Sequence, residues 1–402
     1  MARASIRDVA DGFRRTFGRD PQGVWSAPGR VSVMGDHTDT QDGLAFGFGI
    51  DLRTTVAVAT RTDGRIVVAT DLAPERAEAD LATIAPGPAM ADWKAYPLGT
   101  VWAVLEHGRE NPPAHLLDGP DELVFLGTGV DVFLTTEVPI GGGLSSSASI
   151  CAALGLALSD LWELGLSRDD LARLGQRVER EAAGADTGRA DHVFALWSEP
   201  GKDVFFDARG NDVSVIDVPN LEGARLQSVV VNTREPHRNW SKPLGDRRRE
   251  CERAAEMLGA QTLREVKLAD LEARAGELGE ATFRRARHVV TEVQRVLELT
   301  RTLREQGPGA IGPILDRSHA SLRDDYGVST ERIELTVELA RHFGAKGARL
   351  TGAGLGGSVL ALLPPESIPA FREAIVDAYR EHGWDDPELY EVASAEGARR
   401  DV

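Results

Sequence analysis

The sequence predicts an α+β fold with two domains, in which helices cover the faces of β-sheets. Short β-rich runs dominate residues 24–70, long charged helices are indicated between about 246 and 305, and helices and strands are mixed in the rest. A chain of 402 residues with 42% hydrophobic residues can fill the cores of two or three domains. We place the boundary in the polar stretch 198–202, which gives an N-terminal domain, 1–200, and a C-terminal domain, 201–402.

The N-terminal region is expected to start with an amphipathic helix and to continue as antiparallel strands. Ile6, Val9, Ala10, Phe13 and Phe17 repeat at helical spacing. Acidic residues interrupt this segment, so we do not expect a signal or transit peptide. Strands are predicted at 24–34, 52–60 and 65–70, and the Pro-, Ala- and Gly-rich stretch 74–92 is predicted to be a loop.

A strand, a glycine loop and a helix are predicted in that order within residues 131–164. Apolar residues alternate in 131–138, and they keep helical register over 150–162. A second helix is expected over 167–183, with Asp170 completing an approximate capping box.

The C-terminal half is expected to alternate between strands and helices. We predict strands at 203–208, 213–218, 226–233, 347–351, 359–364 and 389–394, and helices between about 246 and 305, at 330–344 and at 366–382.

Composition excludes several classes of function. Lys+Arg 46 against Asp+Glu 63 gives a net charge of -17, which repels nucleic acid and anionic membranes, and only Arg247 to Arg249 form a basic run. No stretch of 18 consecutive apolar residues predicts a membrane span. Two cysteines are too few for a disulfide framework or a structural zinc site, so we expect a reducing, cytoplasmic location.

The glycine loop GGGLSSSAS, residues 141–149, is predicted to bind phosphate. Glycines can turn successive N–H groups inward, and the following helix adds the partial positive charge of its N-terminus. The alternative is a plain helix start capped by serine. The loop is not a Walker A motif, because that pattern requires a lysine where leucine stands. The predicted ATP-binding residues of this loop are Gly141, Gly142, Gly143, Leu144, Ser145, Ser146 and Ser147.

A second glycine loop, GAGLGG at 352–357, matches the G-x-G-x-x-G pattern of dinucleotide-binding loops. Such a loop must open a helix, whereas VLALLP, 359–364, continues as an apolar strand that a proline closes. We therefore reject a dinucleotide-binding interpretation.

Three segments resemble the three motifs of the GHMP kinases, and their details are most similar to galactokinases. They are GRVSVMGDHTDTQDG at 29–43, PIGGGLSSSAS at 139–149, and the block from SHASLRDDYGVS to GARLTGAGLGGS within 318–358. The motifs appear in the family's order over nearly the whole chain.

This resemblance implies an N-terminal domain like ribosomal protein S5, a ferredoxin-like C-terminal domain and an active site between them. It also implies transfer of the γ-phosphoryl group of ATP, with Mg2+, to a sugar hydroxyl. The default substrate is galactose, phosphorylated at its anomeric hydroxyl to the sugar 1-phosphate. The alternatives are a kinase of another sugar, aminosugar or cyclitol, and a catalytically weak sugar and ATP sensor. A monomer is expected.

The resemblance assigns roles in phosphoryl transfer to four parts of the chain. Asp191 corresponds to the general base and Arg30 to its partner, which would keep the aspartate ionised. Glu179, twelve residues before Asp191, would bind Mg2+ with Ser146 or Ser147. Its alternative is a solvated helix face. Trp93 would lie near adenine, although a core tryptophan is an equal alternative.

Sugar binding is assigned to Asp36, His37, Asp39 and Gly188. Carboxylates accept hydrogen bonds from vicinal hydroxyls and an imidazole donates or accepts, which suits a polyol. A calcium loop is excluded because residue 49, where it would need glutamate, is glycine. A purely structural turn is the remaining alternative.

Departures from the galactokinase pattern concentrate on the sugar side. Asp36 stands for glutamate, Thr40 for tyrosine, Thr187 for cysteine, His192 for glutamine, and Leu244 for a sugar-contacting tyrosine. A changed set of hydrogen-bonding groups alters which hydroxyls are satisfied. We therefore expect weaker galactose turnover than in a galactokinase with intact motifs. Because Arg30, Glu179 and Asp191 are all present, the sensor alternative is disfavoured.

Overall fold

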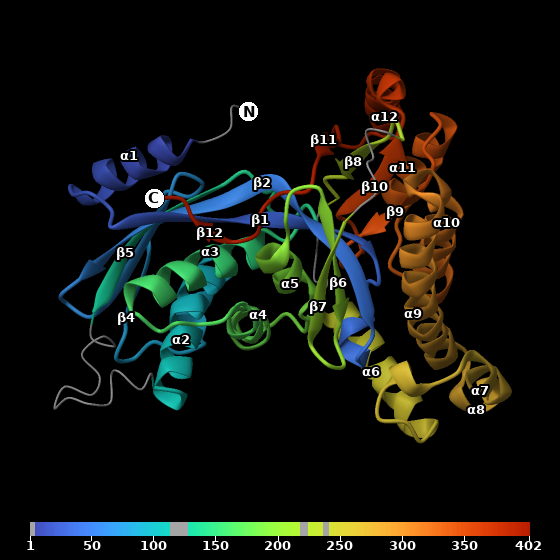
Figure 1. Ribbon diagram of the computed structural model, residues 1–402, viewed down its shortest axis with the longest axis horizontal. Helices are drawn as coiled ribbons and strands as arrows, with labels where there is room; N and C mark the ends of the chain where they lie inside the picture. Colours follow the sequence, from blue (N-terminus) through green and yellow to red (C-terminus); the bar gives the residue numbers. More distant parts are fainter. Residues whose placement is uncertain (1–4, 113–127, 218–223, 236–240) are drawn as a thin grey trace.

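The computed structural model describes residues 5–112, 128–217, 224–235 and 241–402 (Figure 1). The strands of these residues are β1 (Gly23–Met34), β2 (Leu44–Arg61), β3 (Arg65–Thr70), β4 (Ala77–Asp80), β5 (Gly129–Thr136), β6 (Lys202–Asp207), β7 (Asp212–Asp217), β8 (Gln227–Asn232), β9 (Ala348–Thr351), β10 (Ser358–Leu363), β11 (Glu388–Val392) and β12 (Arg399–Arg400).

The helices flank these strands. They are α1 (Ile6–Phe17), α2 (Ala95–Glu110), α3 (Ser146–Leu161), α4 (Arg168–Arg177), α5 (Ala190–Trp197), α6 (Ser241–Met257), α7 (Leu268–Ala273), α8 (Ala275–Leu278), α9 (Glu280–Gln306), α10 (Gly312–Ser321), α11 (Glu331–His342) and α12 (Ile368–Glu381). Two π-helical turns, Val178–Ala182 and Leu322–Tyr326, extend α4 and α10. Among the described residues, no helix is both long and apolar enough to cross a membrane.

The strands of the described ranges form two sheets. The larger has the order β12-β1-β2-β5-β3-β4, with β6 paired to β2 and β7 paired to β6. The smaller is antiparallel, with the order β11-β8-β10-β9. Within the predicted antiparallel region, β1 and β2 pair antiparallel as expected, whereas β3 pairs parallel with β5 from outside that region.

Helices cover both faces of the larger sheet. The helices α2 to α5 lie on one face, where α3 packs against β1 and β2, and α1 packs on the other face against β5 (Figure 1). The helical face predicted for α1 is confirmed, because Val9 and Phe13 are buried against Phe133 and neighbouring strand residues. The capping box of α4 is also confirmed, since the backbone N–H of Asp170 donates to the Ser167 hydroxyl at 3.1 Å.

A third apolar cluster joins the two sheets and positions the site. Val31 and Met34 of β1 share this cluster with Val296 of α9, Leu315 of α10 and Leu360 of β10. Every residue of β1 is buried. The strand runs from the first core, which is the apolar cluster between the larger sheet and helices α2 to α5, into the junction. The loop that follows β1 therefore emerges against the helices of the C-terminal half.

The predicted domain boundary does not coincide with the boundary between the sheets. The strands β6 and β7 follow residue 200, yet β6 pairs with β2 in the larger sheet, and β12 returns to pair with β1. Sequence composition marked a polar stretch at 198–202, but strand pairing is a long-range property that composition does not reveal. The division at residue 200 itself stays a prediction.

The prediction of a loop at 74–92 is partly wrong, because this segment contains the strand β4. This strand pairs antiparallel with the edge of β3, and only its Ala77 is fully buried. Alanine and glutamate have low strand propensity, so pairing with β3 decides the conformation. The helices α2, α5 and α10 were not predicted. The interpretation of 352–357 as a turn between two strands is confirmed by the pairing of β9 with β10.

Candidate active site

A pocket of about 100 Å3 brings together residues far apart in sequence. Its lining includes the predicted site residues Arg30, Asp36, His37, Asp39, Gly188 and Asp191. The departing residues Thr40, Thr187 and Leu244 also line it. The same wall contains Asp186, Arg248, Tyr326, Gly352 and Ala353, which the sequence did not single out as site residues.

Arg30 and Asp191 form a bidentate ion pair at the edge of the phosphate loop. Arg30 Nε lies 2.7 Å from Asp191 Oδ1, and its Nη2 lies 2.6 Å from Oδ2. Arg30 Nη1 donates to the Gly143 carbonyl at 2.5 Å, and the Ser145 hydroxyl donates to Asp191 Oδ2. The predicted base, its arginine partner and the glycine loop are therefore in direct contact.

Asp191 and Asp39 have pKa values shifted in opposite directions. Burial alone would raise the pKa of Asp191, but the charge and hydrogen bonds of Arg30 outweigh burial and hold that pKa below its usual value. Burial raises the pKa of Asp39, and the nearby negative charge of Asp191 adds to this shift. The environments of these two carboxyl groups thus shift their pKa values apart, and Asp191 is the one whose ionised form the pocket stabilises.

Asp39 and Gly188 are packed against each other. The backbone N–H of Ala190 donates to Asp39 Oδ2 at 2.9 Å. A Cβ atom at position 188 would lie 1.9 Å from Asp39 Oδ2, so a larger residue cannot fit without moving the carboxylate. Glycine at this position therefore permits Asp39 to lie at the start of α5.

His37 is neutral and stacked on Tyr326. The two ring centroids are 4.3 Å apart at an interplanar angle of 21°. Burial, followed by the nearby ring of His288, lowers the pKa of His37 to about 3. The backbone of His37 has φ 65, a left-handed conformation that is uncommon for residues other than glycine. Surrounding contacts must hold this conformation.

Asp36 is held by residues of the second half of the chain. Its Oδ2 is paired with Arg349, a fully buried residue of β9, and its Oδ1 accepts from the Gly352 N–H at 3.1 Å. Arg349 Nη1 also donates to the Val33 carbonyl at 2.6 Å. A carboxylate has about four acceptor positions, so Asp36 keeps capacity for a ligand hydroxyl.

The phosphate loop has the backbone conformation that its glycines predict. Gly141 and Gly143 have positive φ angles, as does Ser145, which precedes the first residue of α3. The Ser358 hydroxyl of β10 donates to the Gly142 carbonyl, so the second glycine loop and its strand pack beneath the first. The N-terminus of α3 is thus available for an anion.

Glu179 is a buried carboxylate beside the phosphate loop. It lies in the π-helical turn after α4, and its Oε1 accepts from the Ser147 hydroxyl at 2.8 Å. Ser146, the other serine predicted to bind the metal, is the first residue of α3. Thr187 donates to its other oxygen. In the described part of the chain no lysine or arginine pairs with Glu179, and the only ion-pair contact is His192 at 3.6 Å. The predicted alternative, a solvated helix face, is wrong because Glu179 is 4% exposed.

This donor set fits a magnesium ion. A buried carboxylate without a guanidinium or ammonium partner is costly unless a cation compensates it. Carboxylate and hydroxyl oxygens are the ligands that Mg2+ prefers, and the ion usually takes few of them from protein because phosphates and waters supply the rest. Glu179 and Ser147 meet that requirement.

Two further positions that the sequence singled out, His192 near the predicted base and Trp93 near the predicted adenine site, do not line the pocket of about 100 Å3. His192 is buried behind Glu179 and does not line the pocket. Trp93 lies in a short 3-10 turn and is partly buried against the first core. Its neighbours border a second pocket of about 370 Å3 that Trp93 itself does not line; the lining residues are Met90, Ala91, Asp92, Ala95, Tyr96, Ala183 and Ala185.

Tyr326 and Arg349 are the main contacts that the sequence did not reveal. Both lie within the segment 318–358 that resembles the third kinase motif, so the signal was present. Their partners, His37 and Asp36, are about 300 residues earlier in the chain. Only the folded chain brings these residues together.

Comparison with known proteins identifies the family. Protein-family models match residues 100–199 as the GHMP kinases N terminal domain, 299–381 as the GHMP kinases C terminal domain, and 11–60 as the galactokinase galactose-binding signature. The chain is 39% identical to a galactokinase of Streptomyces coelicolor over 100% of both chains. The chain belongs to the galactokinase family. It is also 35% identical to a galactokinase of Mycobacterium tuberculosis, over 93% of this chain and 98% of that one.

Solved structures agree with this membership. A Lactococcus lactis galactokinase complexed with galactose matches with a TM-score of 0.88 and 27% identity, over 98% of this chain and 99% of that one. The Methanococcus jannaschii mevalonate kinase, with a TM-score of 0.62 and 18% identity over 93% of this chain and 98% of that one, shares the fold. The predicted GHMP kinase fold and the predicted class, a sugar kinase, are confirmed.

Proposed function

We propose that this galactokinase-family protein transfers the γ-phosphoryl group of ATP to the anomeric hydroxyl of galactose, giving galactose 1-phosphate. The observation that supports this most directly is the ion pair of Arg30 and Asp191 between a phosphate loop and a polar pocket. The galactokinase galactose-binding signature over residues 11–60 supports galactose as the sugar.

Asp191 acts as the general base for the sugar hydroxyl. Because the pKa of this carboxyl is held below its usual value, the group is ionised at neutral pH and can accept a proton. Arg30 fixes the orientation of the carboxylate through two hydrogen bonds. Its charge also lies beside the phosphate loop, where it stabilises negative charge that develops on the transferred group.

ATP binds with its phosphates at the glycine loop 141–147, at the N-terminus of α3. Glu179 and Ser147, which are hydrogen-bonded to each other, would hold Mg2+, and the bound ion would neutralise phosphate charge. The adenine end extends toward the second pocket. The residues that line this pocket include Asp92, next to Trp93, and Ala183, which follows the π-helical turn of Glu179. Phosphoryl transfer needs aligned groups more than covalent chemistry, and this arrangement supplies the alignment.

The sugar is bound by the segment 35–40 together with Gly188 and Asp191. Asp36 and Asp39 accept hydrogen bonds from sugar hydroxyls, and the neutral His37 donates or accepts one. Thr40, Thr187 and Leu244 complete the wall and differ from the usual galactokinase residues. We therefore infer a lower kcat/KM for galactose than in galactokinases that keep the motif.

A screen of ATP consumption over aldoses, aminosugars and inositols tests the proposal. We expect galactose to give the highest kcat/KM, and 31P NMR to identify the product as the 1-phosphate. A higher kcat/KM for another compound would contradict galactose as the substrate. Binding of galactose and ATP without turnover would instead favour the sensor alternative. Omission of Mg2+ should abolish turnover, whereas persistent turnover in chelator would contradict the metal assignment.

A further inference from the structure

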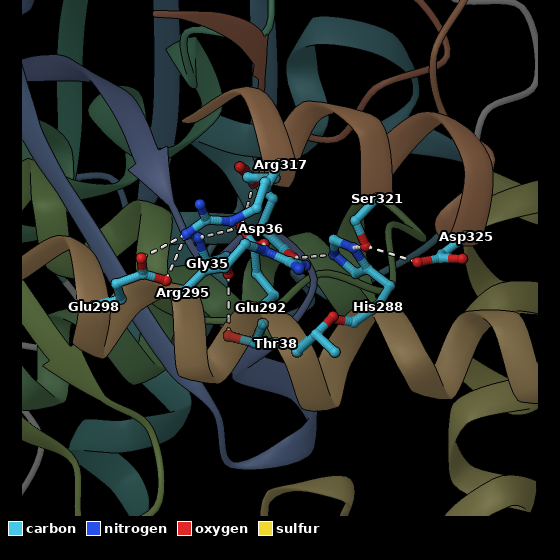
Figure 2. Close-up of polar contacts among 12 residues, drawn as sticks. Gly35, Asp36, Thr38, His288, Glu292, Arg295, Glu298, Arg317, Ser321 and Asp325 are labelled. Atoms are coloured by element: carbon cyan, nitrogen blue, oxygen red, sulfur yellow. Dashed lines mark hydrogen bonds and ion pairs between the residues drawn. The ribbon is translucent and has the colours of Figure 1, made fainter. Parts of the chain in front are cut away.

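Two charged or ionisable side chains of α9, His288 and Glu292, are completely buried beneath the sugar-binding segment. They are four residues apart, so they lie on the same face of the helix, one turn from each other. Figure 2 shows both side chains reaching the turn formed by Gly35, Asp36 and Thr38. None of the catalytic steps described above uses them.

The two side chains bind the backbone on both sides of Asp36. Glu292 Oε1 accepts from the Gly35 N–H at 3.1 Å. His288 Nε2 lies 3.1 Å from the Asp36 carbonyl oxygen. Because a carbonyl can only accept, Nε2 must carry the proton. The two bonds form a clamp, defined here as His288 and Glu292 on the backbone of Gly35 and Asp36.

The charge of Glu292 is fixed by its own partners. Arg295 Nε donates to its Oε2 at 2.6 Å, and the Ser318 hydroxyl donates to Oε1 at 2.7 Å. Burial alone would raise the pKa of Glu292, but Arg295 and the other partners lower it to about 2. An ionised acceptor forms a stronger bond with a backbone N–H than a neutral one does.

The ring of His288 is held from behind. Its Nδ1 lies 3.0 Å from the Ser321 hydroxyl, which is itself 3.0 Å from Asp325 Oδ2 (Figure 2). Asp325 belongs to the same π-helical turn as Tyr326, on which His37 is stacked. Because Nδ1 carries no proton, the one hydroxyl hydrogen of Ser321 is donated either to Nδ1 or to Asp325. Ser321 therefore places the His288 ring beside the π-helical turn that carries the aromatic surface under His37.

The clamp fixes the peptide plane that precedes a strained residue. The Asp36 carbonyl belongs to the same peptide group as the His37 nitrogen. A hydrogen bond to that oxygen therefore fixes the plane of this peptide group, next to which His37 has φ 65. A left-handed conformation at a residue other than glycine persists only where surrounding contacts determine it. Internal bonds of Thr38 close the turn but do not touch the Asp36 carbonyl.

We propose that His288 and Glu292 are positioning residues that set the geometry of Asp36 and His37 for sugar binding, without touching the sugar. This inference rests on the proposed function of the pocket. It assigns the affinity for sugar, and not the phosphoryl-transfer step, to a pair of side chains on α9. Loss of the clamp should therefore act on sugar KM more than on ATP KM.

Comparison of Glu292→Gln with Glu298→Gln tests the proposal. Glu298 lies on the same helix and also joins α9 to α10, through Arg317 at 2.6 Å, but it is 40% exposed and does not reach the turn (Figure 2). We expect Glu292→Gln to raise the galactose KM about tenfold, the effect of weakening a charged hydrogen bond. The ATP KM should stay within about twofold, and Glu298→Gln should match the wild type in both constants.

A second pair of variants separates positioning from folding. His288→Gln keeps an N–H donor that can reach the Asp36 carbonyl, whereas His288→Leu removes it. Partial recovery of galactose KM in His288→Gln relative to His288→Leu, at equal thermal stability, would support positioning. Equal effects of both variants, or parallel increases in sugar and ATP KM, would overturn it.

The failure of this inference can be distinguished from failure of the proposed function. If wild-type protein phosphorylates galactose but the clamp variants keep the wild-type galactose KM, the clamp inference is wrong and the function stands. If wild-type protein does not phosphorylate galactose, the function is wrong. Calorimetric titration of galactose into wild-type and Glu292→Gln protein then still tests the clamp inference. We expect the galactose Kd of Glu292→Gln to be about tenfold weaker, and an unchanged Kd would overturn the inference.

Discussion

The phosphate loop and the sugar-binding segment are both short loops at the end of a strand, but they are stabilised in different ways. The phosphate loop lies between β5 and α3 within one continuous stretch. Glycines with positive φ and the start of α3 give it its shape, and distant residues bond its Gly142 and Gly143 carbonyls, through Ser358 and Arg30. The segment 35–40 follows β1, and its geometry depends on α9, β9 and a π-helical turn about 250 to 310 residues later.

This difference explains why the two loops diverge differently. A loop built from local backbone geometry tolerates little change, and the motif PIGGGLSSSAS is nearly unaltered from the family pattern. A loop held by distant side chains can change its own residues while the supports keep its backbone in place. The substitutions at Asp36 and Thr40 lie in the loop of this second kind.

The largest effect is expected for Asp191→Asn, on the phosphate side of the comparison. The amide keeps the shape and one acceptor for Arg30 but cannot take a proton, so kcat should fall about 100-fold to 10,000-fold. Steady-state kinetics with galactose would measure this change. Unchanged turnover would show that Asp191 is not the base. Galactose Kd, measured by calorimetry, should change far less than kcat.

The next effect is expected for Arg349→Met, on the sugar side. Arg349 is fully buried and pairs with Asp36, so its removal leaves a buried carboxylate without a partner. We expect the free energy of unfolding to fall by about 3–5 kcal/mol, measured by urea denaturation. The double variant with Asp36→Asn should recover part of the loss. If it recovers none, the ion pair is not the source of the effect.

A smaller effect is expected for Gly188→Ala. The added Cβ would overlap Asp39 Oδ2 and displace that carboxylate by about 1 Å or more, which should lower kcat/KM for galactose about 100-fold. The matched control is Gly309→Ala, where a Cβ meets no atom within 4 Å. Equal activity of both variants would contradict a role for Asp39 in sugar binding.

The smallest effect, taken for each pH unit of change, is a pH dependence that belongs to the sugar side. Burial lowers the pKa of His37 to about 3 and that of His288 to about 4, from 6.5. Below pH 6.5 the two histidines of the unfolded chain therefore bind protons that those of the folded chain do not. The free energy of unfolding is highest above pH 6.5 and decreases as the pH falls.

Urea denaturation between pH 4 and 7 measures this loss. Each histidine contributes a slope of up to about 1.4 kcal/mol per pH unit, so His288→Gln should reduce the slope of the wild-type curve by about that amount. Parallel curves for the two proteins would show that His288 is not held neutral in the folded state.

Local patterns made part of the site predictable. The spacing of apolar residues predicted α1, α3 and α12, and the Ser167–Asp170 pair predicted the start of α4. Resemblance to kinase motifs singled out Arg30 and Asp191, which form an ion pair in the structure.

Other features could not be predicted because they depend on long-range pairing. The strand β4 has weak propensity and exists through its pairing with β3, while β6 extends the larger sheet beyond the expected boundary. The kinase resemblance assigned Glu179 to the magnesium site but left an exposed helix face as the alternative, and only packing shows that it is buried beside Ser147.

The sequence by itself determined the family, the fold and the phosphate loop, since glycine conformation and helix starts are local properties that neighbouring residues encode. Tertiary structure alone decided how the sugar-binding segment is held. The contacts of Glu292 with Gly35 and of Arg349 with Asp36 join residues more than 250 positions apart. Such contacts form only when α9 and β9 of the C-terminal half pack against the end of β1 in the N-terminal half. No local sequence pattern specifies this packing.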